Sequence, residues 1–295
     1  MNKSKNKFYK KKKVQFLVLT IILLAFANSC MTMRMSDKKV MKTFKKIKQI
    51  PKIYHDTFEG KPIRYIADKP FNKLLPTIIF VHGAPGSSDN FYKHLQDTTF
   101  QKKANLVSVD RLGYGYSNFG IAEVSIKKQA QMIAYIAKKY EQTKIVLVAW
   151  SYGGAIIAKM AMDNPKIDHL VMIAPALSPK DEKYFWFGNF AKWKATRWIA
   201  PKAFQVAEDE KLAHANELKK IEKNWFKIKA HISYFHGNDD GLVPYKNMNY
   251  LKSKVNDSLV SYFTIDKGSH FIIFKNYDLI RDEILKVLEK IKMDY

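Results

Sequence analysis

Cysteine is almost absent from this chain of 295 residues, and Cys30 is the only one. A single cysteine excludes a disulfide within the chain and any zinc or iron–sulfur site built from several cysteines. The other potential ligands form no metal-ligand cluster in the sequence, so we expect no metal and no cofactor. A chain of this length can bury a large core without such crosslinks.

Acidic residues are scarce: 27 Asp and Glu stand against 51 Lys and Arg, for a net charge of +24. Such a charge suits nucleic acid or an anionic membrane surface. The chain shows no helix-turn-helix, zinc-finger or base-stacking pattern, so we expect no nucleic-acid partner. Apolar residues make up 47% of the sequence, which excludes a disordered chain.

The sequence also lacks an apolar run near the ~20 residues that span a bilayer comfortably. Its N-terminus instead has a basic segment, residues 1–13, followed by the apolar run VQFLVLTIILLAFA from Val14 to Ala27. This layout is typical of a secretory signal, which we place at residues 1–29. We therefore expect an exported protein.

The signal can end in three ways. Cys30 follows the small Ser29, which resembles the lipobox of bacterial lipoproteins, and that resemblance implies a diacylated Cys30 and membrane anchoring on the extracytoplasmic side. Cleavage after Ala25-Phe26-Ala27 would instead release a soluble protein, and an uncleaved segment would remain as a short anchor. We interpret residues 30–53, which are rich in Lys and Met, as a basic tether. The composition suits a tether or a helix lying against anionic headgroups, and a plain solvated linker fits it equally well.

From residue 54 to residue 295, short apolar runs alternate with longer helical patterns. The alternation predicts an α/β fold with a mostly parallel central sheet flanked by helices. The predicted strands are Ile63–Ala67, Thr77–Val81, Leu106–Val109, Lys144–Trp150, Leu170–Ile173, His231–Phe235 and Leu259–Ile265, and the predicted helices are Val124–Lys139, Gly153–Met162, Glu208–Lys223 and Leu279–Lys292.

The carboxyl ends of these strands carry the informative motifs, because active sites of parallel sheets lie there. The run before Ser151 leads into AWSYGG and then into an apolar helix. Small residues two positions either side of Ser151, namely Ala149 and Gly153, are what a strained turn between strand and helix requires. A helix cap alone would not explain those neighbours, so we predict that Ser151 is a nucleophile.

A serine nucleophile needs a base and a carboxylate behind it. Asp239 and Asp240 follow one strand in GNDDGLVP, and His270 follows the last strand in GSHF, which gives the chain order Ser, Asp, His. We expect Asp110, in DRLGYGYS, to fix a loop rather than to act in catalysis. We expect His82 and His236 to pack turns. The remaining histidines have no partner pattern and are expected to be surface or core residues.

Together with HGAPGS at residues 82–87, these five ordered motifs resemble the α/β-hydrolase superfamily over roughly residues 54–293. The resemblance implies Ser151 as nucleophile, Asp240 as acid and His270 as base. It also implies that the backbone N–H groups of Ala84 and Tyr152 form the oxyanion hole. Ala149 departs from the commoner glycine and adds one methyl group beside the turn.

The same resemblance places a short helical cap at about residues 178–224. It implies a serine hydrolase with an acyl-enzyme intermediate, acting on a small-molecule ester. A proline-iminopeptidase-like or other amide hydrolase is the alternative, and a run of acids (Glu208, Asp209 and Glu210) could hold its substrate amine or begin a solvated helix. A catalytically silent hydrolase fold that binds ligands at the cell surface is a third possibility.

Overall fold

The computed structural model describes residues 12–16, 19–20, 32–186 and 188–293. Its centre is an eight-stranded sheet with the order β1-β2-β4-β3-β5-β6-β7-β8. The first two pairings, β1 with β2 and β2 with β4, are antiparallel, and the others are parallel. The strands are β1 (Lys52–Phe58), β2 (Lys61–Ala67), β3 (Thr77–Val81), β4 (Asn105–Val109), β5 (Ile145–Trp150), β6 (Ile167–Ile173), β7 (His231–Gly237) and β8 (Val260–Ile265).

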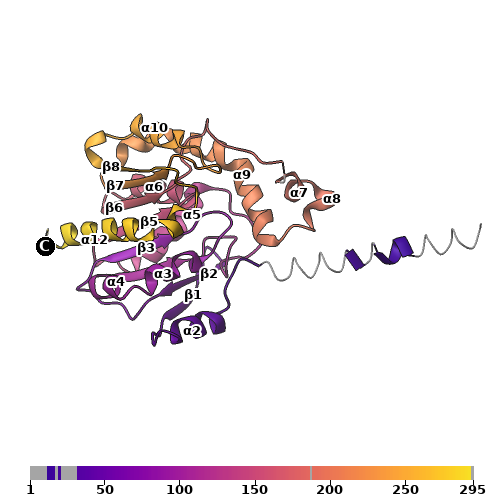
Figure 1. Cartoon of the computed structure of the whole chain (residues 1–295). Helices are drawn as coiled ribbons and strands as arrows, with labels where there is room; N and C mark the ends of the chain where they lie inside the picture. The colour runs from indigo at the N-terminus through magenta and orange to yellow at the C-terminus, as the bar shows by residue number, and fades with distance from the viewer. Residues whose placement is uncertain (1–11, 17–18, 21–31, 187, 294–295) are drawn as a thin grey trace, which may run out of the picture.

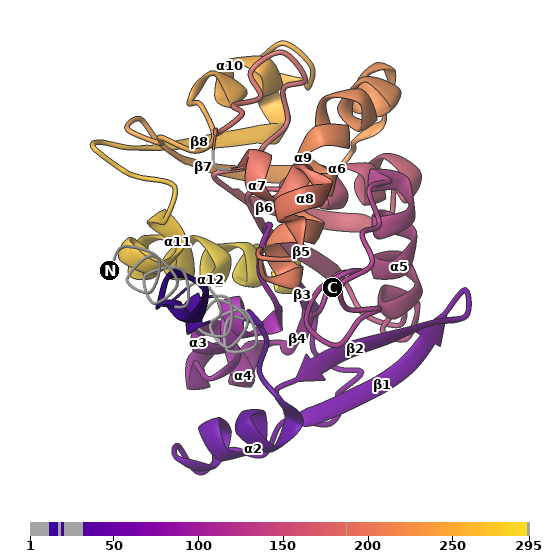
Figure 2. The same cartoon turned by 90° about the vertical axis from the view of Figure 1, so that its right-hand side faces the viewer.

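Helices cover both faces of this sheet (Figures 1 and 2). One face carries α5 (Ile126–Lys138), α6 (Gly153–Asp163) and α10 (Lys246–Lys252). The other carries α2 (Asp37–Lys45), α3 (Tyr92–Leu95), α4 (Thr98–Lys103), α11 (Ile272–Lys275) and α12 (Tyr277–Met293). Short 3-10 turns lie at η1 (Ser88–Phe91) and η3 (Asp257–Leu259). This arrangement confirms the predicted fold class.

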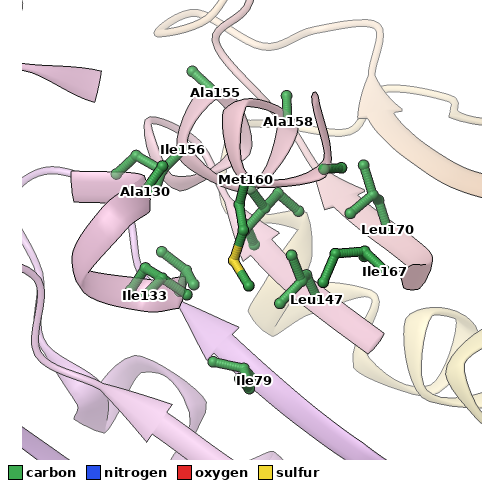
Figure 3. Packing of buried hydrophobic residues seen from close by; sticks show 14 of the residues in the cluster. Ile79, Ala130, Ile133, Leu147, Ala155, Ile156, Ala158, Met160, Ile167 and Leu170 are labelled. Atoms are coloured by element: carbon green, nitrogen blue, oxygen red, sulfur yellow. The ribbon is translucent and has the colours of Figure 1, made fainter. Parts of the chain in front are cut away.

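The central strands are mostly apolar because both of their faces are covered. Every residue of β3, β4 and β5 is buried, and most of these residues are apolar, as strands covered on both faces require. On the face under α5 and α6, Ile79 and Leu147 of the sheet pack with Ile133 and Met160 of the helices (Figure 3). This rigid centre fixes the positions of the loops that leave its carboxyl edge.

The predicted strands are all present, but β1 was missed. β1 has the sequence KIYHDTF, with charged residues among its apolar ones, and it pairs only with β2 at the sheet edge. An edge strand buries little of its surface, so it carries no long apolar run. The helix predicted to start at Glu208 also starts earlier, as part of α9 (Lys202–Ile221).

Within residues 30–53, which the sequence analysis interpreted as a tether, the structure has a helix that packs on the core rather than a solvated linker. Residues Asp37–Lys45 form α2, which Ser36 caps by accepting a hydrogen bond from the Lys39 backbone. Val40 and Phe44 of this helix are fully buried against the core. The two buried residues are four positions apart and lie among basic residues, so the segment contains no apolar run that marks a packed helix. Strand β1 then begins at Lys52.

The segment between β6 and β7 contains the predicted cap region. It holds α7 (Gly188–Lys192), α8 (Lys194–Arg197), α9 (Lys202–Ile221) and the 3-10 turn η2 (Glu222–Lys227). Of the helices within the described ranges, none has the length and apolar character needed to cross a membrane. Cys30 and most of the predicted signal segment lie outside the described residues.

Candidate active site

Ser151 lies in a sharp turn between β5 and α6. Its φ is +57°, a left-handed conformation that is strained for a residue with a side chain. The turn is crowded: a Cβ on Gly153 would lie 2.6 Å from the carbonyl oxygen of Val81, and one on Gly83 would lie 2.9 Å from Cβ of Ser151. Glycine is therefore needed at both positions, and the prediction of a strained strand–turn–helix is confirmed.

A continuous chain of hydrogen bonds leads from Ser151 to a carboxylate. Nε2 of His270 is 2.9 Å from Oγ of Ser151, and Nδ1 of His270 is 2.7 Å from Oδ2 of Asp240. All three side chains are buried. Since the carboxylate accepts the Nδ1–H proton, the neutral ring presents its Nε2 lone pair to the serine hydroxyl. The structure thus brings together the three residues that the sequence analysis selected.

Two loops approach closely to make this contact. A Cβ on Gly237 would lie 2.0 Å from the carbonyl oxygen of Gly268, so no side chain fits where the loop after β7 passes the loop after β8. Asp239, in the same loop, donates its backbone N–H to that Gly268 carbonyl at 3.1 Å while its side chain is exposed. The next residue, Asp240, turns inward toward His270.

The surroundings of Asp240 keep its carboxylate ionised. Burial raises the pKa of this group, but hydrogen bonds from His236 and His270 and the backbone N–H of Val243 outweigh it, and the net pKa is well below the usual range. Oδ1 accepts the backbone N–H groups of Leu242 and Val243, both at 2.8 Å. The acid therefore stays charged and fixed in one orientation.

His236 is a neighbour of the acid that the sequence analysis assigned only to turn packing. Its Nε2 donates to the carbonyl oxygen of Val243 at 3.1 Å, and its Nδ1 accepts from the Tyr234 hydroxyl at 2.9 Å. The same Nε2 is 3.4 Å from Oδ2 of Asp240. His236 packs the turn as expected and also holds the far side of the acid.

The two residues predicted to donate backbone N–H groups to the oxyanion, Ala84 and Tyr152, lie beside Ser151. Ala84 follows β3, Tyr152 stands at the N-terminus of α6, and both line one cavity with Ser151 and His270. A helix N-terminus favours negative charge, which suits an oxyanion beside Tyr152. His82 packs the loop before Ala84 as expected, because its Nε2 accepts the Arg111 backbone N–H at 3.0 Å.

The cavity has a volume of about 680 Å³ and a mostly apolar wall. It is lined by side chains from the cap, from the loops after β7 and β8, and from the chain before β1. In the described part of the chain, no group of three or more His, Cys, Asp or Glu could hold a metal ion. The apolar lining includes Met33, Trp150, Tyr184, Phe185, Ala191, Ala200, Pro201, Phe204, Ala207, Leu242, Phe271 and Phe274.

Asp110 fixes a loop, as the sequence analysis expected. It accepts backbone N–H groups of Ser88 at 2.8 Å and Tyr116 at 2.9 Å, and it pairs with Nε of Arg64 at 2.7 Å. These contacts use both carboxylate oxygens. Arg64 also binds Asp37, so the same network ties α2 to the sheet.

The acids of α9 are not a solvated helix start. Glu210 is fully buried and receives Nη1 and Nη2 of Arg111 at 2.7 and 3.0 Å and the hydroxyl of Tyr114 at 2.6 Å. Asp209 pairs with Arg197. Only Glu208 of the three lines the cavity, where burial raises the pKa of its carboxyl. The network joins the cap to the loop after β4.

Comparisons with known proteins agree with this fold. A sequence model of the α/β hydrolase fold family matches residues 76–216. A crystal structure of a membrane phospholipase A, described as a bacterial virulence factor, superposes with a TM-score of 0.66 at 16% identity, over 97% of this chain and 99% of that one. The crystal structure of the haloalkane dehalogenase DatA from Agrobacterium tumefaciens superposes with a TM-score of 0.65 at 15% identity, over 82% of this chain and 97% of that one.

One curated relative is also similar in sequence. The chain is 26% identical over 145 residues to protein phosphatase methylesterase 1 of Candida albicans, a match that covers 47% of this chain and 39% of that protein. The chain thus spans about two fifths of this relative. The protein therefore has the α/β-hydrolase fold.

Proposed function

We propose that the protein is a serine hydrolase that cleaves carboxylic esters through an acyl-enzyme intermediate. The observation that carries this proposal is the hydrogen-bonded chain from Ser151 through His270 to Asp240 at the wall of an apolar cavity. A hydroxyl, an imidazole and a buried carboxylate in this order make an activated nucleophile with its base.

The geometry supports a balanced two-step reaction. Oγ of Ser151 attacks the ester carbonyl carbon while its proton passes to Nε2 of His270, and the backbone N–H groups of Ala84 and Tyr152 stabilise the oxyanion. The imidazolium then gives the proton to the leaving alkoxide. In the second step, a water attacks the acyl-enzyme and gives its proton to His270, which returns it to the Ser151 oxygen as the acid departs. Asp240 stabilises the imidazolium throughout.

The cap favours an ester over the amine-bearing substrate of an iminopeptidase. Such a substrate needs free carboxylates to bind its ammonium group, whereas Asp209 and Glu210 are already paired with Arg197 and Arg111. Glu208 reaches the cavity, but the charges of Lys192 and Lys211 already act on its carboxylate. The methylesterase and the phospholipase A among the similar proteins are named for ester hydrolysis, which is consistent with this choice.

Membrane attachment after export is part of the proposal. The sequence supports it through the basic and apolar N-terminal segment and through Cys30. The cap contributes exposed aromatic side chains, Trp186 and Trp193, beside exposed lysines such as Lys192 and Lys194, which suit an anionic lipid surface. Cys30→Ser should abolish palmitate labelling and release the protein from membranes. Labelling that survives this substitution would exclude lipidation at Cys30.

Labelling with a fluorophosphonate tests the catalytic proposal. The probe should modify Ser151 in the folded protein, and Ser151→Ala should abolish both the modification and the hydrolysis of p-nitrophenyl butyrate. A panel of p-nitrophenyl esters and aminoacyl-naphthylamides then separates ester from amide hydrolysis. A folded protein that is never labelled at Ser151 would be a binding protein instead.

A further inference from the structure

A second histidine lies in the wall of the cavity that Ser151 lines. His214 comes from α9 of the cap, and its side chain is only 1% exposed. Its ring stacks on that of Tyr152, the residue after Ser151, with ring centroids 4.4 Å apart and an interplanar angle of 29°. No sequence motif surrounds His214, so the sequence alone predicts a surface or core residue there.

A carboxylate holds one side of the His214 ring. Nδ1 of His214 is 2.5 Å from Oε1 of Glu182, and the ammonium group of Lys211 binds the other carboxylate oxygen. Burial raises the pKa of Glu182, but the hydrogen bond from His214 and the charge of Lys211 outweigh it and the net pKa is lowered. Because an ionised carboxylate only accepts hydrogen bonds, Nδ1 of His214 carries a proton.

The other ring nitrogen of His214, Nε2, is buried and lacks a hydrogen-bond partner among the described residues. A buried polar atom without a partner costs free energy, and such atoms are rare in folded proteins. In His270 the corresponding nitrogen faces Ser151, so His214 repeats the carboxylate–imidazole arrangement of the site without a protein group at its end.

We propose that Nε2 of His214 binds a hydroxyl group of the substrate, so that the enzyme selects hydroxyl-bearing esters. This inference rests on the proposed ester hydrolysis. With Nδ1 protonated, a neutral His214 accepts a hydrogen bond at Nε2, and an imidazolium donates one. A hydroxyl satisfies either form because it is both donor and acceptor. A substrate ammonium group would instead meet Lys211 at close range, and the apolar wall disfavours other charged groups.

Two matched pairs of esters test this proposal and locate the hydroxyl. 2-Hydroxyethyl butanoate and propyl butanoate differ in the alcohol part, where OH replaces CH₃. Methyl 6-hydroxyhexanoate and methyl heptanoate differ in the same way in the acyl part. We expect the wild-type protein to prefer the hydroxyl member of one pair by about tenfold in kcat/KM, the effect of one good hydrogen bond.

His214→Phe supplies the matched variant, since phenylalanine keeps a ring against Tyr152 but has no nitrogen. The preference should then fall from about tenfold to near unity. His214→Gln, which has a polar side-chain end, should restore part of the preference. Because His231 is exposed at the opposite end of β7 from the site, His231→Phe is the control and should keep the wild-type preference.

The outcomes separate this inference from the proposed function. Equal kcat/KM values within both pairs for the wild-type protein overturn the hydroxyl site, whether or not any variant folds. A preference that persists in His214→Phe overturns the role of His214. If fluorophosphonate fails to label Ser151 and no ester is hydrolysed, the proposed function itself is wrong, and the hydroxyl site falls with it.

Discussion

The two sides of the cavity use their buried charges differently. On the sheet side, Asp240 and His270 lie in line behind one atom, Oγ of Ser151. On the cap side, Glu210 is matched by Arg111 within a closed network. On the sheet side, the buried polar groups are therefore hydrogen-bonded in a chain that ends at the proposed nucleophile. On the cap side, most buried charges are paired with an opposite charge.

The difference follows from how each side is held in place. The sheet side rests on β5, β7 and β8, whose hydrogen-bonded ladders fix the start of each loop. The described residues of the cap form no such ladder, and the cap is a helical segment between β6 and β7. Its long helix α9 is fixed to the body by side-chain pairs such as Glu210 with Arg111 and by Leu218 and Ile221, which pack in the core. Changes on the sheet side should thus appear in the reaction rate, and changes on the cap side in stability or selectivity.

Asp240→Asn should have the largest effect and should act on the rate. The substitution preserves the size of the side chain and an oxygen for the N–H groups of Leu242 and Val243, so the fold should persist. The imidazole loses its charge support and correct tautomer, at a cost of about 10⁴ in kcat for a related triad. We expect a similar loss with p-nitrophenyl butyrate and an unchanged midpoint of urea unfolding to within ~1 M.

Glu210→Gln should act on stability. It leaves the guanidinium group of Arg111 fully buried without a counter-charge, and breaking a buried pair in this way costs about 3–5 kcal/mol. Urea unfolding measures the loss. The exposed pair of Lys128 and Glu59 gives the control, because Glu59→Gln should cost less than about 1 kcal/mol. Equal losses for the two variants would show that the buried network does not hold the cap.

The fold and the sheet-side residues could be predicted because their signals are local. Continuous apolar runs mark β3 to β5, and small residues flank Ser151 for steric reasons visible in the crowding around Gly153. Ser151 directly follows β5, and Asp240 and His270 lie in the loops after β7 and β8. The parallel sheet then brings separate strand ends together, so the order of motifs along the chain sufficed.

The cap side could not be predicted because its contacts are distant in sequence and have no spacing rule. Arg111 and Glu210 are 99 residues apart, and Glu182 and His214 are 32 apart. A run of three acids has the same composition whether it is solvated or buried. The packing of helix α2 on the core could not be predicted either, since Val40 and Phe44 are its two buried residues and lie in a basic segment.

His94→Phe should change how stability depends on pH, and it tests a histidine outside the cavity. His94 is buried among Phe80, Phe91, Phe100 and Tyr277, with no hydrogen-bond partner for either nitrogen in the described structure. Burial lowers the pKa of His94 to about 3. Below pH ~6.5 the unfolded chain binds a proton that the folded chain does not, so stability falls with pH by about 1.4 kcal/mol per unit.

The variant lacks this titration. Between pH 7.5 and pH 5.5, its unfolding free energy should therefore fall by about 1.4 kcal/mol less than that of the wild type, as measured by urea unfolding at both values. His231→Phe, at an exposed position, is the control for replacing a histidine at the surface. Identical pH dependence in the wild type and His94→Phe would mean that His94 does not resist protonation in the folded protein.

Asp239→Asn should have the smallest effect and sharpens the assignment on the sheet side. The side chain of Asp239 is exposed, and the residue holds its loop through a backbone N–H to Gly268, which asparagine keeps. Successive residues of an extended loop face opposite sides, so one carboxylate of the adjacent pair meets His270 and the other meets solvent. We expect kcat to change by less than about tenfold, or ~1.4 kcal/mol, against the ~10⁴ loss in Asp240→Asn. The reverse ranking in p-nitrophenyl butyrate hydrolysis would mean that the acid stands one residue earlier, and small, equal losses would remove both from the reaction.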